Sequence, residues 1–172
     1  MCGWWRKKGD PEEPRDHALG RSRGGYSTKL HLLCDSEGHP LSYHLTPGQT
    51  HESTVLDIVL ENADNNLAGG DGSRSVPWPV RLTGDKGYRA DWIDTCLIDL
   101  GILPVIPSKS NEDRDSRPVP FDGDSYRKRN IIERIIGWIK ENRRVFSRFE
   151  KSAKNFGGMI KMAFIRCYLK SI

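Results

Sequence analysis

The stretch VRLTGDKGYRADWIDTCLIDLGILPVIP (residues 80–107) indicates a strand, a helix and a second strand in close succession. Short apolar runs predict strands over 80–84 and 102–107. The residues between them, 90–101, predict a helix that ends at Gly101 as its C-cap. The apolar side of that helix would carry Trp92, Ile93, Cys96, Leu97 and Leu100. Strands joined by a right-handed helical crossover are typical of a mixed α/β domain.

Within this stretch, GDKGY (residues 84–88) places one carboxylate, Asp85, directly after the first strand. Gly84 and Gly87 flank it closely, with Lys86 beside it and Tyr88 three places on. A solvated turn would explain such an acid, and so would a metal site at a strand end. The choice between these interpretations depends on a partner carboxylate elsewhere in the chain.

Upstream, residues 26–46 alternate between apolar and polar side chains, which predicts a β-hairpin with its turn at SEGHP. Leu30, Leu32 and Cys34 would lie on one face of the first strand, and Leu41, Tyr43 and Leu45 continue the pattern in the second. Residues 52–63 then predict a helix capped by Glu52 or Ser53, and residues 64–79 a loop. For His51 we favour a capping or packing role over phosphate or metal contact.

Downstream, residues 125–149 predict one long helix, followed by a last helix over 155–172. The buried stripe of the long helix would consist of Ile132, Ile135, Ile136 and Ile139. At about 100° per residue, a second stripe falls within an arc of roughly 60°. That stripe contains Tyr126, Arg129, Glu133 and Lys140, and Arg144 lies on the same line. A solvated face with ion pairs would explain it, and so would a site where bases hold phosphate and the acid holds a metal ion.

The bulk properties bound the class of protein. The 172 residues suit one domain, and the net charge of +4 with a pI near 8.9 permits an acidic partner without requiring one. The four cysteines are too far apart for a CxxC zinc pattern, and we expect buried thiols at Cys34 and Cys96 in a reducing compartment. No apolar run approaches the length of a membrane span, and the first residues lack a secretory signal pattern.

The spacing of Tyr126, Arg129, Glu133 and Lys140 resembles the Y-R-E-K signature of the DDE transposases of bacterial insertion sequences. Further segments are similar to that family in its order, and the resemblance runs from about His17 to the C-terminus. These segments are GRSRGGYSTKLHLLCD (20–35), LTPGQTHE (45–52), GDKGY, LPVIP (103–107) and FEKSAKNF (149–156).

The resemblance implies an RNase H-like α/β fold and metal-dependent DNA cleavage and strand transfer at insertion-sequence ends. It implies that Asp85 is the second acid and Glu133 the third acid of a DDE triad, and that they hold Mg²⁺, with Mn²⁺ as an alternative. The residues implied to contact DNA are Tyr126, Arg129, Lys140, Arg144, Arg21 and Arg23. For the last two, in GRSRGG, a plain linker is an equally good interpretation.

The first acid of the triad has no evident counterpart. Asp10 and Asp16 lie in a charged, proline-rich segment without a strand pattern, and we interpret Asp35 as a turn residue rather than a substitute ligand. We therefore expect an irregular start region over 1–19 and a partial catalytic domain over 20–172 that lacks the first, central strand. Such a chain would be a truncated or frameshifted product, inactive alone. Whether it is an enzyme stays open.

The alternative function is a non-catalytic DNA-binding remnant or a regulator of a full-length transposase. In either case the expected partners are the element's ends and target DNA, together with further copies of the chain or the full-length transposase. We expect a cytoplasmic, nucleoid-associated protein without membrane contact.

Overall fold

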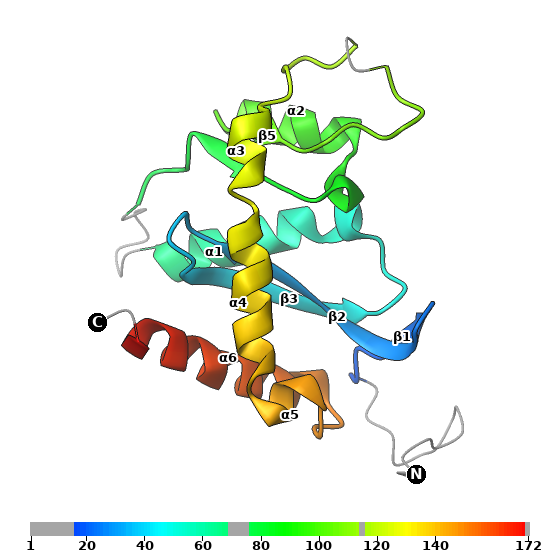
Figure 1. Ribbon diagram of the computed structural model, residues 1–172, viewed down its shortest axis with the longest axis vertical. Coiled ribbons are helices and arrows are strands. Elements are labelled where there is room, and N and C mark those ends of the chain that lie inside the picture. The colour runs from blue at the N-terminus through cyan, green and yellow to red at the C-terminus, as the bar shows by residue number, and fades with distance from the viewer. Residues whose placement is uncertain (1–15, 69–75, 114–115, 171–172) are drawn as a thin grey trace.

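The computed structural model describes residues 16–68, 76–113 and 116–170, and its order of elements is that of a mixed α/β protein (Figure 1). The prediction of an α/β class is therefore confirmed. The strands are β1 (Gly20–Ser22), β2 (Gly25–Cys34), β3 (Pro40–Pro47), β4 (Arg81–Thr83) and β5 (Leu103–Val105). The helices are η1 (Glu52–Val55), α1 (Leu56–Leu67), η2 (Lys86–Tyr88), α2 (Asp91–Asp99), α3 (Gly123–Arg127), α4 (Asn130–Lys140), α5 (Arg143–Phe146) and α6 (Ala153–Lys170).

The described strands form two separate sheets. The first is antiparallel in the order β1-β2-β3, and its register pairs Leu30 with Leu45 and Leu32 with Tyr43, as expected for the predicted hairpin. The second contains only β4 and β5, which run parallel and are joined by α2. Beyond Ser27, the edge of β2 that faces away from β3 has no strand partner among the described residues, and neither has the second edge of β4.

The β2–β3 hairpin lies between two apolar clusters because its side chains alternate between its faces. One face carries Leu30, Leu32, Tyr43 and Leu45, which pack on a cluster formed by α4, α5 and α6. The other face is turned to α1, where the Ser42 hydroxyl donates to the Val59 carbonyl at 2.7 Å. The second cluster joins α1, β4, α2 and the residues on either side of β5. Its members are Leu56, Leu60, Leu82, Ile93, Leu97, Ile102 and Ile106.

The prediction of one helix over 125–149 is wrong, because three short helices occupy this stretch. The chain tightens between α3 and α4, where the Arg129 amide donates to the Tyr126 carbonyl three residues earlier. It breaks again at Asn142, whose ψ of 107° is extended. Even so, α3 and α4 run one after the other past the hairpin toward α5 and α6, as the yellow ribbon in Figure 1 shows.

The buried side of α4 also differs from the predicted stripe. Ile135 and Ile139 are buried as expected, but Ile132 and Ile136 are only partly buried, and Ile131 packs on the cluster instead. The buried residues thus follow a spacing of four, because the hairpin and α6 both lie on that side of the helix. In α2, Ile93 and Leu97 are fully buried, whereas Trp92 and Leu100 are exposed, against the prediction.

Of the remaining predictions, the structure confirms some, corrects others and describes the start region only in part. Gly101 has a φ of +74°, as a C-cap glycine should. The predicted buried thiols of Cys34 and Cys96 are only partly buried. Residues 16–19 of the predicted irregular start region have no helix or strand, and residues 1–15, with Asp10, lie outside the described residues. None of the described helices combines the length and apolar character needed to span a membrane.

Candidate metal and nucleic-acid site

Asp85 follows β4 and precedes η2, with extended backbone angles (φ −69°, ψ 158°). Its side chain caps no backbone amide, and about 60% of it is exposed to solvent. Packing explains the two flanking glycines. A Cβ on Gly84 would lie 3.1 Å from Ile106 Cγ1, and one on Gly87 would lie 2.8 Å from Glu52 Oε2. The glycines therefore let the Asp85 loop lie close to β5 and η1.

Glu133 lies in the first turn of α4 and shares a partner with Asp85. Arg129 Nη2 donates to Glu133 Oε1 at 2.7 Å, and Arg129 Nη1 lies 3.9 Å from Asp85 Oδ2. The Arg129 guanidinium also stacks over the Tyr126 ring, 5.5 Å from its centroid. The structure therefore brings together four of the predicted site residues, from the end of β4, from α3 and from the start of α4.

The chemistry of this pair suits a hard cation. Asp85 and Glu133 are both exposed carboxylates that converge on one positive charge, and Mg²⁺ prefers oxygen ligands while it keeps several waters. The pair has no third member in the part of the chain that the structure describes, where no group of three His, Cys, Asp or Glu side chains could hold a metal. The two carboxylates fit a divalent ion that stays largely hydrated.

The remaining predicted bases lie apart from this pair. Lys140 is the last residue of α4, seven residues or roughly 10 Å along the axis from Glu133. Arg144 belongs to α5, after the break at Asn142, and its Nε lies 3.7 Å from Glu150 Oε1. No ion pair joins either base to Asp85 or Glu133, so the straight predicted stripe ends with α4.

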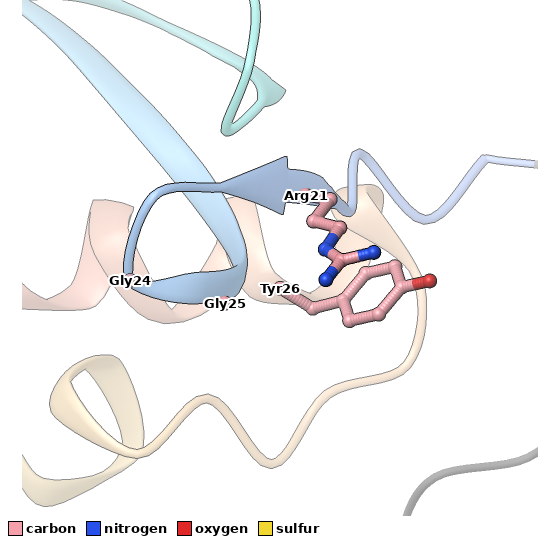
Figure 2. Close-up of a pocket in the computed structure, with 4 residues that line it drawn as sticks. All are labelled: Arg21, Gly24, Gly25 and Tyr26. Carbon is pink, nitrogen blue, oxygen red and sulfur yellow. The ribbon is translucent and has the colours of Figure 1, made fainter.

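Arg21 and Arg23 belong to the β1–β2 hairpin. Arg21 pairs with Tyr26 across the two strands, and Figure 2 shows its guanidinium beside the Tyr26 ring, with Gly24 and Gly25 in the adjoining turn. Both side chains are exposed, and they line a shallow hollow. Such a surface offers a positive charge to phosphate and a ring face to a base. Arg23 is exposed in the turn.

Two side-chain networks that the sequence did not reveal hold the Asp85 loop against the hairpin. Lys29 Nζ donates to Glu52 Oε1 and to the Thr50 carbonyl, both at 2.7 Å, and Glu52 in turn lies against Gly87. Beside it, His31 is buried, with Nδ1 3.0 Å from the Tyr88 hydroxyl and Nε2 2.9 Å from Thr46 Oγ1.

Burial, with a smaller contribution from the nearby Lys29 charge, lowers the pKa of His31 to about 4, and burial raises the pKa of Tyr88. The neutral imidazole is therefore the form that joins β2 to the end of GDKGY. The sequence feature that could have indicated this bond is a histidine at an inward position of an alternating strand. The sequence does not indicate that Tyr88 is its partner.

A third unpredicted network is ionic and holds the segment after β5 on α2. Asp94 accepts from Arg117 Nε at 3.1 Å and from Arg117 Nη2 at 2.9 Å, and it lies 3.4 Å from Arg89 Nη1. Arg89 also pairs with Glu112 and with Asp91. The only signal in the sequence was an acid next to Ile93 on the buried side of α2.

Asp35 and His51 have the structural roles that we predicted. Asp35 Oδ1 accepts from the backbone amides of Glu37, Gly38 and His39 at 2.8–2.9 Å, and Oδ2 lies 3.0 Å from His39 Nδ1. Burial alone would raise the pKa of Asp35, but these bonds together lower it. His51 caps η1, since its Nδ1 accepts from the Ser53 amide.

The model of the family described as "Transposase DDE domain" matches residues 5–168. The chain belongs to the DDE transposase family. Because the match covers nearly the whole chain, it includes both carboxylates and all the bases discussed above, and it confirms the resemblance that the Y-R-E-K spacing indicated.

Two relatives come from insertion sequences. The chain is 31% identical over 160 residues to a Burkholderia cepacia protein named "Putative transposase for insertion sequence element IS402", an alignment of 92% of this chain and 67% of that one. It is 28% identical over 144 residues to the Brucella ovis "Putative transposase for insertion sequence element IS6501". That alignment covers 84% of this chain and 99% of the relative. No solved structure matches this DDE transposase chain significantly.

Proposed function

We propose that this chain carries two of the three metal-binding carboxylates of a transposase that cuts and joins DNA at insertion-sequence ends. The observation that carries the proposal is the convergence of Asp85 and Glu133 on Arg129. These residues come from the separate motifs GDKGY and Y-R-E-K, and only the fold brings them together. A hard divalent ion, Mg²⁺ or Mn²⁺, is the cofactor that two carboxylate oxygens and retained water would suit.

We propose further that residues 20–172 form a partial RNase H-like domain. The unpaired edges of β2 and β4 support this, because an additional strand would supply the partner that such an edge lacks. In the family's arrangement that central strand carries the first acid. The part of the chain that the structure describes supplies neither the strand nor a third carboxylate beside the pair.

Each residue has a defined task in this proposal. Bound metal would supply an activated water or DNA 3′-hydroxyl and would stabilise the leaving oxygen. Asp85 and Glu133 hold that ion through their exposed carboxylates, and Tyr126 packs against the DNA. The positive charges that hold phosphate are Arg129, Lys140, Arg144, Arg21 and Arg23. The DNA partners are the element's ends and its target, bound by an assembly with further copies or with a full-length transposase in the bacterial nucleoid.

A second candidate function is that of a DNA-binding regulator without catalysis. The observation that favours it is the lack of a third metal ligand beside Asp85 and Glu133 among the described residues. Such a chain would compete with a full-length transposase for DNA ends or would join its assembly. The two candidates differ in DNA cleavage, whereas both require DNA binding.

The activity of the 172-residue chain should decide between these candidates. We expect no cleavage of end-containing DNA in Mg²⁺ or Mn²⁺, because two carboxylates alone do not align the attacking oxygen with the phosphate. Extending the chain upstream by a strand that carries the missing Asp should restore cleavage. In the extended protein, Asp85→Asn and Glu133→Gln should abolish it, whereas the matched control Asp124→Asn on α3 should not. Cleavage by the short chain that is lost in Asp35→Ala would contradict the proposal and make Asp35 a ligand.

DNA binding by the same chain should depend steeply on salt. If about four phosphates are neutralised, the logarithm of affinity should fall with the logarithm of salt concentration at a slope of roughly −3 to −4. Replacing Arg129 and Lys140 together by alanine should make the slope less steep by roughly 2. The control pair Lys154→Gln and Lys161→Gln on α6 should leave it unchanged. Fluorescence anisotropy with duplex DNA measures both, and a slope near zero would refute the DNA-binding role.

A further inference from the structure

We propose that Arg129 occupies the position of the metal in the metal-free protein and has to leave the carboxylates when a divalent cation binds. This inference rests on the proposed metal site at Asp85 and Glu133. It adds a role for Arg129 that precedes its contact with DNA phosphate: Arg129 is a positioning residue that keeps two like charges together until the cation replaces it.

The contacts of Arg129 support this role. Its two terminal nitrogens face different carboxylates, Nη2 at 2.7 Å from Glu133 Oε1 and Nη1 at 3.9 Å from Asp85 Oδ2. Within the described part of the chain, no other cationic side chain lies within 4 Å of either carboxylate. Without the guanidinium, two negative charges would face each other without compensation, and the Asp85 loop and α4 would repel.

A divalent cation would compete for the same oxygens. Oε1 of Glu133 and Oδ2 of Asp85 are the oxygens that the guanidinium faces, and carboxylate oxygens are the ligands that a divalent cation would take. A guanidinium cannot stay between two oxygens that coordinate a dication, because like charges repel and the space is filled. The exchange is easy, since ion pairs of exposed carboxylates are weak.

The structure also provides a place for the displaced guanidinium. Arg129 already stacks over the Tyr126 ring at 5.5 Å, and its side chain is about 25% exposed at the start of α4. A small shift over this ring would turn the same N–H donors from the carboxylates toward solvent, where DNA phosphate would accept them. Metal binding and phosphate binding would then favour each other, because the first releases the donor that the second needs.

A titration of the full chain with Mn²⁺ in the absence of DNA, followed by electron paramagnetic resonance of free Mn²⁺, tests the inference. Arg129→Gln removes the competing cation and should bind Mn²⁺ about two- to fivefold more tightly than the wild type. Arg129→Lys, which keeps the charge without the forked geometry, should lie between them. The matched control is Arg127→Gln. Arg127 lies two residues before Arg129, and within the described part of the chain its ion pair is with Asp124, at 3.2 Å. Its Mn²⁺ affinity should equal that of the wild type.

The outcomes separate this inference from the function on which it rests. If Asp85→Asn and Glu133→Gln both bind Mn²⁺ as the wild type does, the metal site itself is refuted, and the inference with it. If those variants lose Mn²⁺ but Arg129→Gln binds it no more tightly than the wild type, the site stands and the role of Arg129 is refuted. Tighter binding in Arg129→Gln and not in Arg127→Gln supports both.

Discussion

Replacing Asp94 by alanine is expected to lower the free energy of unfolding by about 3–5 kcal/mol, because it leaves buried positive charge without its partner. Only 3% of the Asp94 side chain is exposed. Its carboxylate accepts three hydrogen bonds of 2.9–3.1 Å from Arg117 and lies 3.4 Å from Arg89, and both guanidinium groups are as buried as Asp94. Burial in this cluster keeps water from replacing the lost acceptor.

Asp91→Ala is the matched control for this prediction. Asp91 lies one turn earlier on α2 and also pairs with Arg89, at 2.7 Å, but its side chain is 95% exposed. An exposed ion pair contributes little, so this variant should cost less than about 1 kcal/mol. Urea unfolding followed by circular dichroism measures both. Equal costs for the two variants would show that burial does not set the strength of the Asp94 network.

The Asp94 network matters for the site because of what it holds. Arg117 also donates to the Ile106 carbonyl at 2.5 Å, so it fixes the segment after β5 to the end of that strand. This segment leads into α3 and α4, and Arg129 and Glu133 lie at the start of α4. Loss of Asp94 should therefore loosen the connection between the Asp85 side of the site and the Glu133 side.

Much of the fold could be predicted because it depends on local pattern. The alternation of residues 26–46 determined the hairpin and its facing pairs, and short apolar runs located β4 and β5. The prediction of one long helix over 125–149 was wrong for a different reason. Its isoleucines are compatible with several buried faces, and the break at Asn142 reflects packing of α5 against α6, which periodicity does not contain.

The site was predictable only in part. Spacing put Arg129 and Glu133 on one helix face. The link to Asp85 depended on the resemblance to a family, because the sequence does not give the distance in space between two motifs that lie far apart in it. The Asp94–Arg117 and His31–Tyr88 pairs could not be predicted, because each joins a residue in a regular element to a partner from a loop or short turn. The glycines of GDKGY are explained by close packing, because a Cβ on Gly84 would meet Ile106 and one on Gly87 would meet Glu52.

The stability of the protein should fall as the pH falls from about 6.5 toward 4, because of His31. Burial lowers the pKa of this histidine from its ordinary value of 6.5 to about 4 in the folded state. Between these two values the unfolded chain binds a proton that the folded chain refuses, so acid favours unfolding. The contribution is complete above pH 6.5 and is lost as the pH falls. Its slope cannot exceed about 1.4 kcal/mol per pH unit, and the total is about 3 kcal/mol.

Urea unfolding at pH 5, 5.5, 6, 6.5 and 7 measures this slope. Glu52 and Asp35 have lowered pKa values, so their own contributions are lost only at more acidic pH. His31→Gln, which cannot take up a proton, should lose the slope between pH 5 and 6.5. Tyr88→Phe removes the hydroxyl beside Nδ1 and should cost about 1 kcal/mol at neutral pH. It should keep the slope, because burial rather than that hydrogen bond is the main cause of the lowered pKa.

The comparison of these two variants connects stability with the site. The His31–Tyr88 bond joins β2 to the end of GDKGY, three residues after Asp85. Protonation of His31 brings a charge into this buried position and should release Tyr88 before the whole chain unfolds. A wild-type slope that survives in His31→Gln would contradict this account and assign the acid sensitivity to other groups. A slope lost in His31→Gln and kept in Tyr88→Phe would assign the acid sensitivity to the buried imidazole and not to its bond with Tyr88.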